Sequence, residues 1–260
     1  MTNAANVQYH LLSSTRYDDA LLTVAWNTRV NDGIPSKFML LPYHFDRLAA
    51  AAEQHGWIAS QQRLARDEFT AACDNAVIAA HSEHGNVPLK IRILLAQDAI
   101  FTASATPAIG VCGLQLPTVP YDMTPVRKIY IDLEPTSPSI FTKTKTTRRS
   151  VYNVARARVN LSPMPTPADA HLDILLHNQN GFAMETSIRN IAFWRDQRWV
   201  TPSLATGCLS GVMRRVLLEE FGVLEQDTKI DNVLLGEVVL IFNGVDGMQY
   251  AEVVSLPIPR

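Results

Sequence analysis

The chain has 260 residues, enough for one large domain or two modest ones with a full hydrophobic core. Apolar residues make up 47% of it and charged residues 18%, which excludes a disordered, collagen-like or coiled-coil protein. The net charge of −2 gives no global reason to bind nucleic acid or an anionic membrane, so we expect neither partner. Lysine is scarce, and the six lysines are Lys37, Lys90, Lys128, Lys143, Lys145 and Lys229.

The cysteines and histidines carry no metal or disulfide signature. Cys73, Cys112 and Cys208 are scattered, and an odd, unclustered set suits a reducing compartment. The seven histidines show no metal-ligand spacing, so no metal is expected. The first residues lack the basic and apolar regions of a signal peptide, and no apolar run approaches the ~18 residues that span a bilayer. We therefore expect a cytoplasmic protein.

The first half of the chain mixes helix and strand patterns. Apolar spacing predicts helices over residues 43–56 and 68–81, and strands over 87–95 and 109–116. In the first of these strands apolar residues alternate with Lys90 and Arg92, which indicates one wet face. Residues 102–110 between the strands are small, polar and interrupted by proline.

A proline-rich stretch divides the chain. Residues 117–125 hold three prolines and no periodic pattern, so we expect a linker there between domains at 1–116 and 126–260. After it, the patterns predict strands at 126–133, 171–178, within 188–202 and at 236–242, helices at 150–159 and 211–221, and a surface loop at 162–168. The sum is an α+β protein in two parts with a strand-rich second half.

Residues 142–158, TKTKTTRRSVYNVARAR, form the densest basic cluster. On charge alone, a solvated basic helix or a weak nucleic-acid patch explains it. However, Lys143 and Lys145 are flanked by β-branched threonine, which disfavours helix, so the segment starts as a strand or turn that leads into a helix. A near-neutral protein that gathers cations at one strand end often holds an anion there.

Three further segments could carry chemistry, and each has a simpler explanation. Residues 207–215, GCLSGVMRR, open a helix whose free N–H groups suit a phosphate, although Ser210 as an ordinary N-cap explains them too. His44 and Arg47 share a helix face with Leu48, as they would at an ordinary surface helix start. Glu185 lies in METSIRNIAF, residues 184–193, which reads as a strand, and there it needs a cation unless it sits on an exposed edge.

Taken in order, these segments resemble fold type IV, or class IV, pyridoxal-phosphate aminotransferases and lyases. The family order is H-x-x-R-L, K-T-x-x-R, E-x-x-x-x-N-hydrophobic-aromatic, T-P and G-[VI]-x-R. The matching residues here are His44 to Leu48, Lys145 to Arg149, Glu185 to Phe193, Thr201-Pro202 and Gly211 to Arg214. No motif alone is specific, but all of them in this order at family spacings are hard to obtain by chance.

The resemblance implies a fold and a cofactor. The fold would be a small α/β sandwich domain followed by a larger pseudo-barrel domain, with pyridoxal 5'-phosphate (PLP) in the cleft, in a homodimer. Lys145 would form the Schiff base with the cofactor aldehyde, and Glu185 would hold the pyridine nitrogen protonated. Lys143 is the rival lysine, but only Lys145 gives the K-T-x-x-R spacing.

The resemblance also implies the other cofactor contacts. Arg47 would bind the phosphate together with the amides of Val212 and Met213 at the helix start that Gly211 opens. Leu209 would pack against the ring face. The other implied contacts are Arg149 or Tyr152 near the ring hydroxyl, and Asn243.

Three features favour a 4-amino-4-deoxychorismate lyase, an enzyme of folate biosynthesis that releases pyruvate and 4-aminobenzoate. Met213 stands where transaminases of the family commonly have Thr. Residues 190–202 and residues 240–243 are similar to lyase patterns. The alternative is a class IV aminotransferase acting on branched-chain or D-amino acids or amines.

A pseudoenzyme is a third reading, disfavoured because Lys145 and Glu185 are both present. Candidates for the carboxylate contacts of the small amino substrate are Lys90, Arg92 and Arg29.

Overall fold

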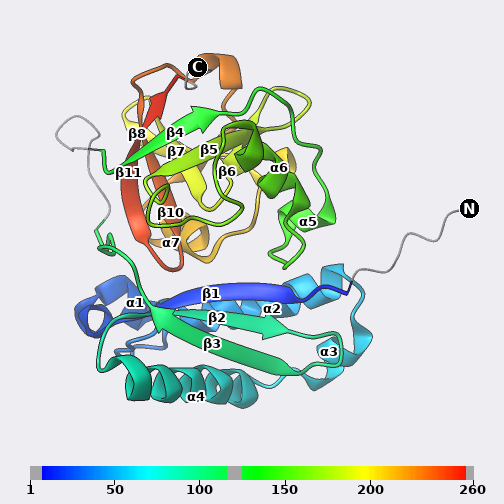
Figure 1. The fold of residues 1–260 in the computed structure, drawn as a ribbon, viewed down its shortest axis with the longest axis vertical. Helices are drawn as coiled ribbons and strands as arrows, with labels where there is room; N and C mark the ends of the chain where they lie inside the picture. Colours follow the sequence, from blue (N-terminus) through cyan, green and yellow to red (C-terminus); the bar gives the residue numbers. More distant parts are fainter. Residues whose placement is uncertain (1–7, 116–124, 256–260) are drawn as a thin grey trace, which may run out of the picture.

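In the computed structural model, which describes residues 8–115 and 125–255, the chain forms two β-sheets with helices packed on them (Figure 1). The smaller sheet has three strands in the order β1-β2-β3. The larger has eight in the order β6-β5-β4-β11-β10-β7-β8-β9 and curls into a half-barrel. The predicted combination of a small α/β part and a larger barrel-like part is confirmed.

The small sheet consists of the antiparallel strands β1 (Leu11–Tyr17), β2 (Leu89–Leu95) and β3 (Phe101–Pro107). In β2 the four alternate apolar residues from Leu89 to Leu95 are fully buried against α2 (Leu41–Gln54) and α4 (Arg66–His84). The strict alternation of β2 places Lys90 and Arg92 on its other face, away from this core. Three shorter helices complete the first part of the chain: η1 (Asp19–Thr23), α1 (Ala25–Val30) and α3 (Ile58–Arg63).

The strands of the large sheet are β4 (Arg127–Ile131), β5 (Leu172–His177), β6 (Ala183–Thr186), β7 (Asn190–Arg195), β8 (Arg198–Thr201), β9 (Leu224–Glu225), β10 (Val238–Asn243) and β11 (Gly247–Val254). The apolar run of β10 is buried on both faces, because Leu240 and Phe242 face one core while Val239 and Ile241 face another. Helices on this part are α5 (Ile140–Lys143), α6 (Ser150–Arg158), η2 (Leu204–Thr206), α7 (Val212–Glu220) and η3 (Ile230–Asn232).

One of these cores crosses the predicted division of the chain. Leu21, Trp26 and Met39 pack with Val212 and Phe242 of the large part. Residues 19–40 therefore help to cover the large sheet, although they precede the predicted linker. That linker, at 117–125, lies almost entirely outside the described residues.

Most predicted elements are confirmed within a few residues, and the strand predicted at 109–116 is wrong. Residues 109–115 form no strand, and only Gly113 makes a single β-bridge, to Gly247. Residues 101–107 instead form β3, an edge strand of mostly small residues whose weak apolar alternation leaves little pattern to read. Strand β1, which no pattern predicted, is buried along nearly its whole length and includes buried Ser13 and Thr15.

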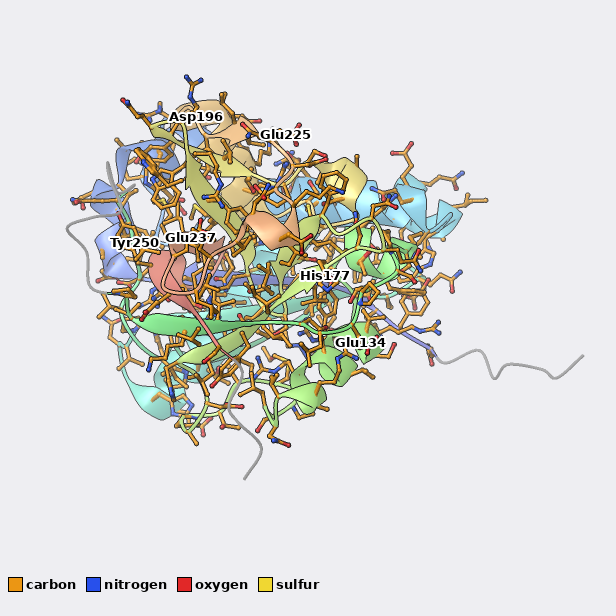
Figure 2. The ribbon with its side chains drawn as sticks, turned by 90° about the horizontal axis from the view of Figure 1, so that it is seen from above. Glu134, His177, Asp196, Glu225, Glu237 and Tyr250 are labelled. Carbon is orange, nitrogen blue, oxygen red and sulfur yellow. The ribbon has the colours of Figure 1, made fainter. Side chains whose placement is uncertain are left out.

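Two of the labelled acidic side chains lie on the surface. Asp196 and Glu225 are exposed and lie at the edge of the molecule in the view from above (Figure 2). No helix in the described part of the chain is long and apolar enough to cross a membrane.

Candidate active site

The segment that carries Lys145 runs between α5 and α6. Helix α5 ends at Lys143, and residues 144–147 continue without regular structure beside the start of β1. Leu12 N–H donates to the Lys145 carbonyl (N to O 2.8 Å), and Thr147 N–H donates to the His10 carbonyl (2.9 Å). Lys143 is exposed on the helix, so the two lysines do not share a strand.

The Lys145 side chain lines a cavity of about 660 Å³ between the two sheets, a volume typical of small-molecule sites. Most residues that the family resemblance implied also line it, namely Arg47, Arg149, Glu185, Leu209, Gly211, Val212 and Asn243. Tyr152 borders an inner pocket that shares Lys145, Arg149 and Glu185 with this cavity. The Met213 side chain is fully buried in the core under α7, but the contact that the resemblance implied is its backbone N–H, which lies in the first turn of that helix.

The cavity is strongly cationic. Seven of its lining residues are cations and two are acids; the cations are Arg47, Lys90, Arg92, Arg127, Lys145, Arg149 and Arg189. The acids are Glu185 and Asp246, and Asp246 is paired with Arg127 and Arg189. The basic cluster predicted at 142–158 thus turns Lys145 and Arg149 inward, which favours the anion-binding interpretation over a nucleic-acid patch.

Burial sets the protonation of the central pair. It lowers the pKa of Lys145 to about 7, with Arg149 and Arg47 adding to the effect and Glu185 opposing it. Burial likewise raises the pKa of Glu185 to about 7. A lysine with this pKa is partly unprotonated at neutral pH and can act as a nucleophile or base. Burial is therefore a larger cause of the lowered pKa of Lys145 than the neighbouring arginines.

Three neighbours hold the Glu185 carboxylate. Tyr152 Oη donates to Glu185 Oε1 (2.8 Å) and Leu209 N–H donates to the same oxygen (3.1 Å). Asn190 Nδ2 donates to Glu185 Oε2 (3.4 Å) and to the Leu209 carbonyl (2.9 Å). Tyr152 therefore gives its hydroxyl to Glu185, and Asn190, from the E-x-x-x-x-N motif, fixes the other oxygen.

A second cluster lies around Arg47 on α2. Arg47 Nη2 donates to Ser13 Oγ (2.6 Å), and Ser13 Oγ lies 2.7 Å from His44 Nδ1. Arginine only donates, so Ser13 Oγ accepts from Arg47 and links it to His44 Nδ1. Burial and Arg47 lower the pKa of His44, which keeps the ring neutral. Arg47 Nε is enclosed and has no hydrogen-bond partner among the described residues.

The start of α7 faces this cluster. Gly211, not Ser210, is the N-cap, and no side chain caps the helix. A Cβ on Gly211 would lie 1.9 Å from Asn190 Oδ1, so only glycine fits there. The first N–H groups of α7 therefore stay free of side-chain caps beside the cavity, where they suit a phosphate.

The other implied or candidate contacts have mixed positions. Asn243 Oδ1 accepts from the N–H groups of Val245 (2.8 Å) and Asp246 (2.7 Å), so this side chain shapes the β10–β11 turn at the cavity wall. Lys90 and Arg92 line the cavity and form no ion pair with another described residue. Arg29 as a carboxylate contact is wrong, since it is exposed and pairs with Glu220.

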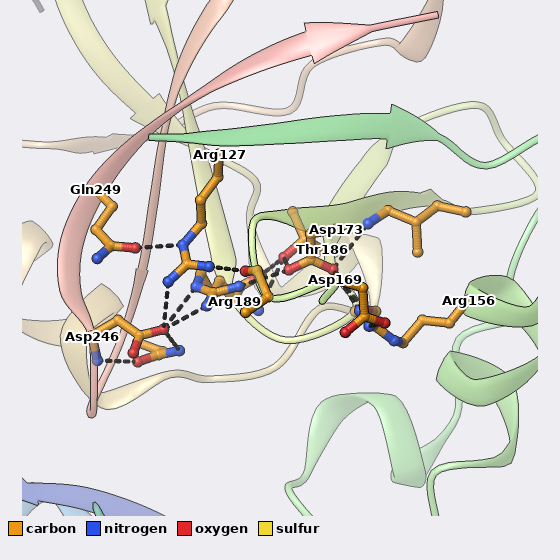
Figure 3. Close-up of polar contacts among 12 residues, drawn as sticks. Arg127, Arg156, Asp169, Asp173, Thr186, Arg189, Asp246 and Gln249 are labelled. Carbon is orange, nitrogen blue, oxygen red and sulfur yellow. Dashed lines mark hydrogen bonds and ion pairs between the residues drawn. The ribbon is translucent and has the colours of Figure 1, made fainter. Parts of the chain in front are cut away.

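A buried ion network braces the turn between β6 and β7 (Figure 3). Arg189 Nη1 pairs with Asp173 (3.0 Å) and its Nη2 with Asp246 (2.6 Å). Arg156 lies 3.7 Å from the other Asp173 oxygen and also pairs with Asp169 (3.3 Å). Nothing in the sequence pattern indicated this network, because its members are far apart in the chain and each reads as an ordinary surface charge.

A half-buried lysine with a pKa of about 7, a buried carboxylate and an arginine beside a helix N-terminus suit an enzyme that holds a small phosphorylated aldehyde. Comparison with known proteins agrees. The chain belongs to the amino-transferase class IV family, which it matches over residues 27–250, and is therefore an enzyme of a PLP-dependent class.

Two yeast proteins are similar in sequence. The aminodeoxychorismate lyase of Saccharomyces cerevisiae is 39% identical over 132 residues, 46% of this chain but only 35% of that protein. A candidate aminodeoxychorismate lyase of Schizosaccharomyces pombe is 30% identical over 225 residues, 84% of each chain. The match thus spans about a third of the first relative and most of the second.

Solved structures share the fold. A candidate amino-acid aminotransferase of Mesorhizobium loti superposes with a TM-score of 0.68 at 22% identity, over 95% of this chain and all of that one. A candidate 4-amino-4-deoxychorismate lyase of Legionella pneumophila gives 0.63 at 15% identity, over 96% and 86% of the two chains. At these identities the likeness shows the fold alone, which is common to aminotransferases and lyases.

Proposed function

We propose that the protein is a PLP-dependent 4-amino-4-deoxychorismate lyase that releases pyruvate and 4-aminobenzoate. The observation that carries the proposal is Lys145, with a pKa of about 7, in a cavity where Lys90 and Arg92 form no ion pair with any residue that the structure describes. The names of the two yeast relatives support the lyase reaction.

The residues fit PLP. Arg47, with an enclosed Nε that lacks a partner, and the free start of α7 would hold the phosphate. Glu185 would face the pyridine nitrogen, and a protonated nitrogen there would turn a costly buried carboxylate into an ion pair. When bound, PLP supplies an aldehyde that bonds to an amine and a ring that withdraws electrons.

The substrate carries two carboxylates and an amine. Lys90 and Arg92 project from one face of β2 into the cavity, so they are suited to bind carboxylates. Lys145, as the free amine, would take the proton from the substrate carbon that bears nitrogen. Loss of the enolpyruvyl group as pyruvate then leaves aromatic 4-aminobenzoate. A proton transfer by a positioned base commonly contributes ~10²–10⁴ in rate.

The second candidate is a class IV aminotransferase. It is favoured by the fold neighbours that carry aminotransferase names, among them the branched-chain enzyme of Escherichia coli. In that case Lys145 would move the proton from the substrate carbon to a carbon of the cofactor, and an oxo acid would leave.

One comparison separates the two. Purified protein with PLP is given 4-amino-4-deoxychorismate in one assay, and D-alanine or leucine with 2-oxoglutarate in another. Equimolar pyruvate and 4-aminobenzoate support the lyase. Oxo acid formed from the amino donor supports the aminotransferase, and no turnover in either assay contradicts both. The expected homodimer is tested by light scattering after size-exclusion chromatography.

A further inference from the structure

We propose that His55 is a positioning residue for Lys145 that acts through Thr144; the proposal rests on the function of Lys145 given above. His55 Nε2 lies 2.8 Å from Thr144 Oγ1, and Thr144 directly precedes Lys145. On the other side of the ring, His55 Nδ1 lies 2.7 Å from the Tyr9 hydroxyl. The Thr144 hydroxyl in turn donates to the Ile140 carbonyl of α5.

These hydrogen bonds form a relay through Tyr9, His55, Thr144 and Ile140, and chemistry fixes the direction of each one. The Ile140 carbonyl can only accept, so the Thr144 hydroxyl donates its proton to it. The Thr144 oxygen must therefore accept a hydrogen bond from His55. His55 therefore carries its proton on Nε2, and Nδ1 accepts from Tyr9. Burial lowers the pKa of His55, which favours this neutral tautomer. No step in the relay is left without a donor or an acceptor.

Aromatic rings pack against the half-buried Tyr9 and His55, while Thr144 itself is buried. Phe141 meets the Tyr9 ring edge-on at 5.2 Å between centroids and lies 5.7 Å from the His55 ring. Trp57 packs 5.6 Å from Tyr9 and 6.0 Å from His55. Because Thr144 is buried, the hydrogen bond that it accepts from His55 is stronger than one in water and can fix the position of Thr144.

The relay adds a second restraint on the lysine segment, beside the one from β1. The main chain of Lys145 is held by Leu12 of β1, and the Thr144 side chain is held by His55, which ends α2. Without the relay, the segment would keep its bonds to β1, His10 and the Ile140 carbonyl, but the Thr144 hydroxyl would lose its bond to α2 and the Lys145 amine would have more freedom to shift. A misplacement of ~1 Å at a reacting group costs about 10²-fold in rate.

A purely structural role for His55 makes a different prediction. The residue caps α2 through its backbone N–H, which bonds to the Ala51 and Glu53 carbonyls. Replacement of the ring leaves that cap in place, so loss of the cap does not explain an effect of ring variants. The unpaired cations Lys90 and Arg92 lie on β2 and do not contact the relay, so substrate binding should be spared.

The test uses paired variants of the cofactor-loaded protein. Thr144→Val removes the hydroxyl, whereas Thr144→Ser keeps it. His55→Leu removes the hydrogen-bond donor to Thr144, whereas His55→Gln keeps an N–H donor. Ser139→Ala is the matched control, because it removes the cap of α5 from its other end and leaves the relay intact. Measured are kcat, KM, the pH midpoint of the cofactor–lysine absorbance and the melting temperature. Borohydride trapping and peptide mapping first locate the cofactor on the wild-type chain.

We expect Thr144→Val and His55→Leu to lower kcat about 10- to 100-fold with KM within about twofold, and to shift the pH midpoint. With Thr144→Ser and His55→Gln, kcat and the pH midpoint should stay close to the wild-type values. Ser139→Ala should lower only the melting temperature. Unchanged kcat and midpoint in the folded Thr144→Val or His55→Leu protein overturn the proposal, as does an equal loss in Ser139→Ala. A wild-type adduct on a residue other than Lys145 would instead overturn the proposed function.

Discussion

Leu12 and Lys145 are joined by a backbone hydrogen bond of 2.8 Å, from the first strand of the small sheet to the lysine of the cavity. The next residue of that strand, Ser13, accepts from Arg47. Strand β1 thus touches both the main chain of Lys145 and the guanidinium proposed to hold the phosphate, although no motif includes it. Changes in β1 should therefore affect both residues.

Lys145→Ala should abolish the borohydride-stable attachment of the cofactor and lower kcat by at least ~10²–10⁴, because both the bond and the base are lost. Cofactor still binds, without that bond, through the cluster around Arg47. Absorbance spectra and peptide mapping check this. Lys143→Ala is the control, because Lys143 is exposed; an adduct that moves to or stays on Lys143 would contradict the assignment.

Ser13→Ala should raise the dissociation constant for PLP by about tenfold. The variant removes a hydrogen bond to a charged group, worth ~1.5–3 kcal/mol, and lets Arg47 turn away from the cavity. Fluorescence titration of the cofactor-free protein measures the constant. Ser82→Ala, which removes an exposed hydroxyl on α4, should leave it unchanged. Equal affinities of wild type and Ser13→Ala would show that Ser13 does not orient Arg47.

Glu185→Gln should change how the stability of the cofactor-free protein depends on pH. Burial raises the pKa of Glu185 from 4.5 to about 7, so the folded state binds more protons than the unfolded state between these values. Stability supplied by this group is full below pH 4.5 and is lost as the pH rises to about 7, by up to ~3 kcal/mol. Denaturant unfolding of both proteins at several pH values gives the difference. A constant difference across this window would contradict the raised pKa.

Lys90→Ala and Arg92→Ala should each raise KM for a dicarboxylate substrate by about tenfold with a smaller change in kcat, as expected for a contact made in both ground and transition state. Steady-state kinetics at fixed ionic strength measure both constants. Arg29→Ala removes an exposed arginine that pairs with Glu220 and should change neither constant. If Arg29→Ala matched the β2 variants, the effect would reflect net charge and not a site.

Asp173→Asn should lower the free energy of unfolding by ~3–5 kcal/mol, because it leaves the buried Arg189 and Arg156 with an uncompensated charge. Thermal and denaturant unfolding test the loss. Arg195→Gln, at a half-exposed pair with Glu237, should cost no more than ~1 kcal/mol. Losses of the same size would show that burial adds nothing to the Asp173 network.

The sequence predicted elements whose pattern is local. The apolar alternation of β2 and the helical spacing of α2 depend on neighbours in the chain, and both are confirmed. Strand β1 escaped because it is buried with Ser13 and Thr15 on its inner positions, so it shows no alternation. These hydroxyls are satisfied by His44, Arg47 and the Met39 carbonyl, partners that only the folded chain supplies.

The site residues that could be predicted are likewise those whose pattern is local in the sequence. Residues within motifs, such as Lys145 and Glu185, could be predicted to share a cavity, and the structure brings them to one. Their supports could not be predicted, because Ser13, His55 and Asp173 act across long separations in sequence. Arg29 was predicted from its charge alone, and the fold places it on the surface beside Glu220, where it cannot reach a substrate in the cavity.

The place of β1 has a consequence for the order of synthesis. Arg16 N–H bonds to the Gly244 carbonyl (3.0 Å), and Leu12 bonds to Lys145, so this early strand waits for partners made much later on the ribosome. Closing such distant contacts is slow and leaves hydrophobic surface exposed in the meantime. A nascent chain halted before residue 244 therefore lacks a finished cavity, and we expect its cofactor affinity to emerge only with the last strands.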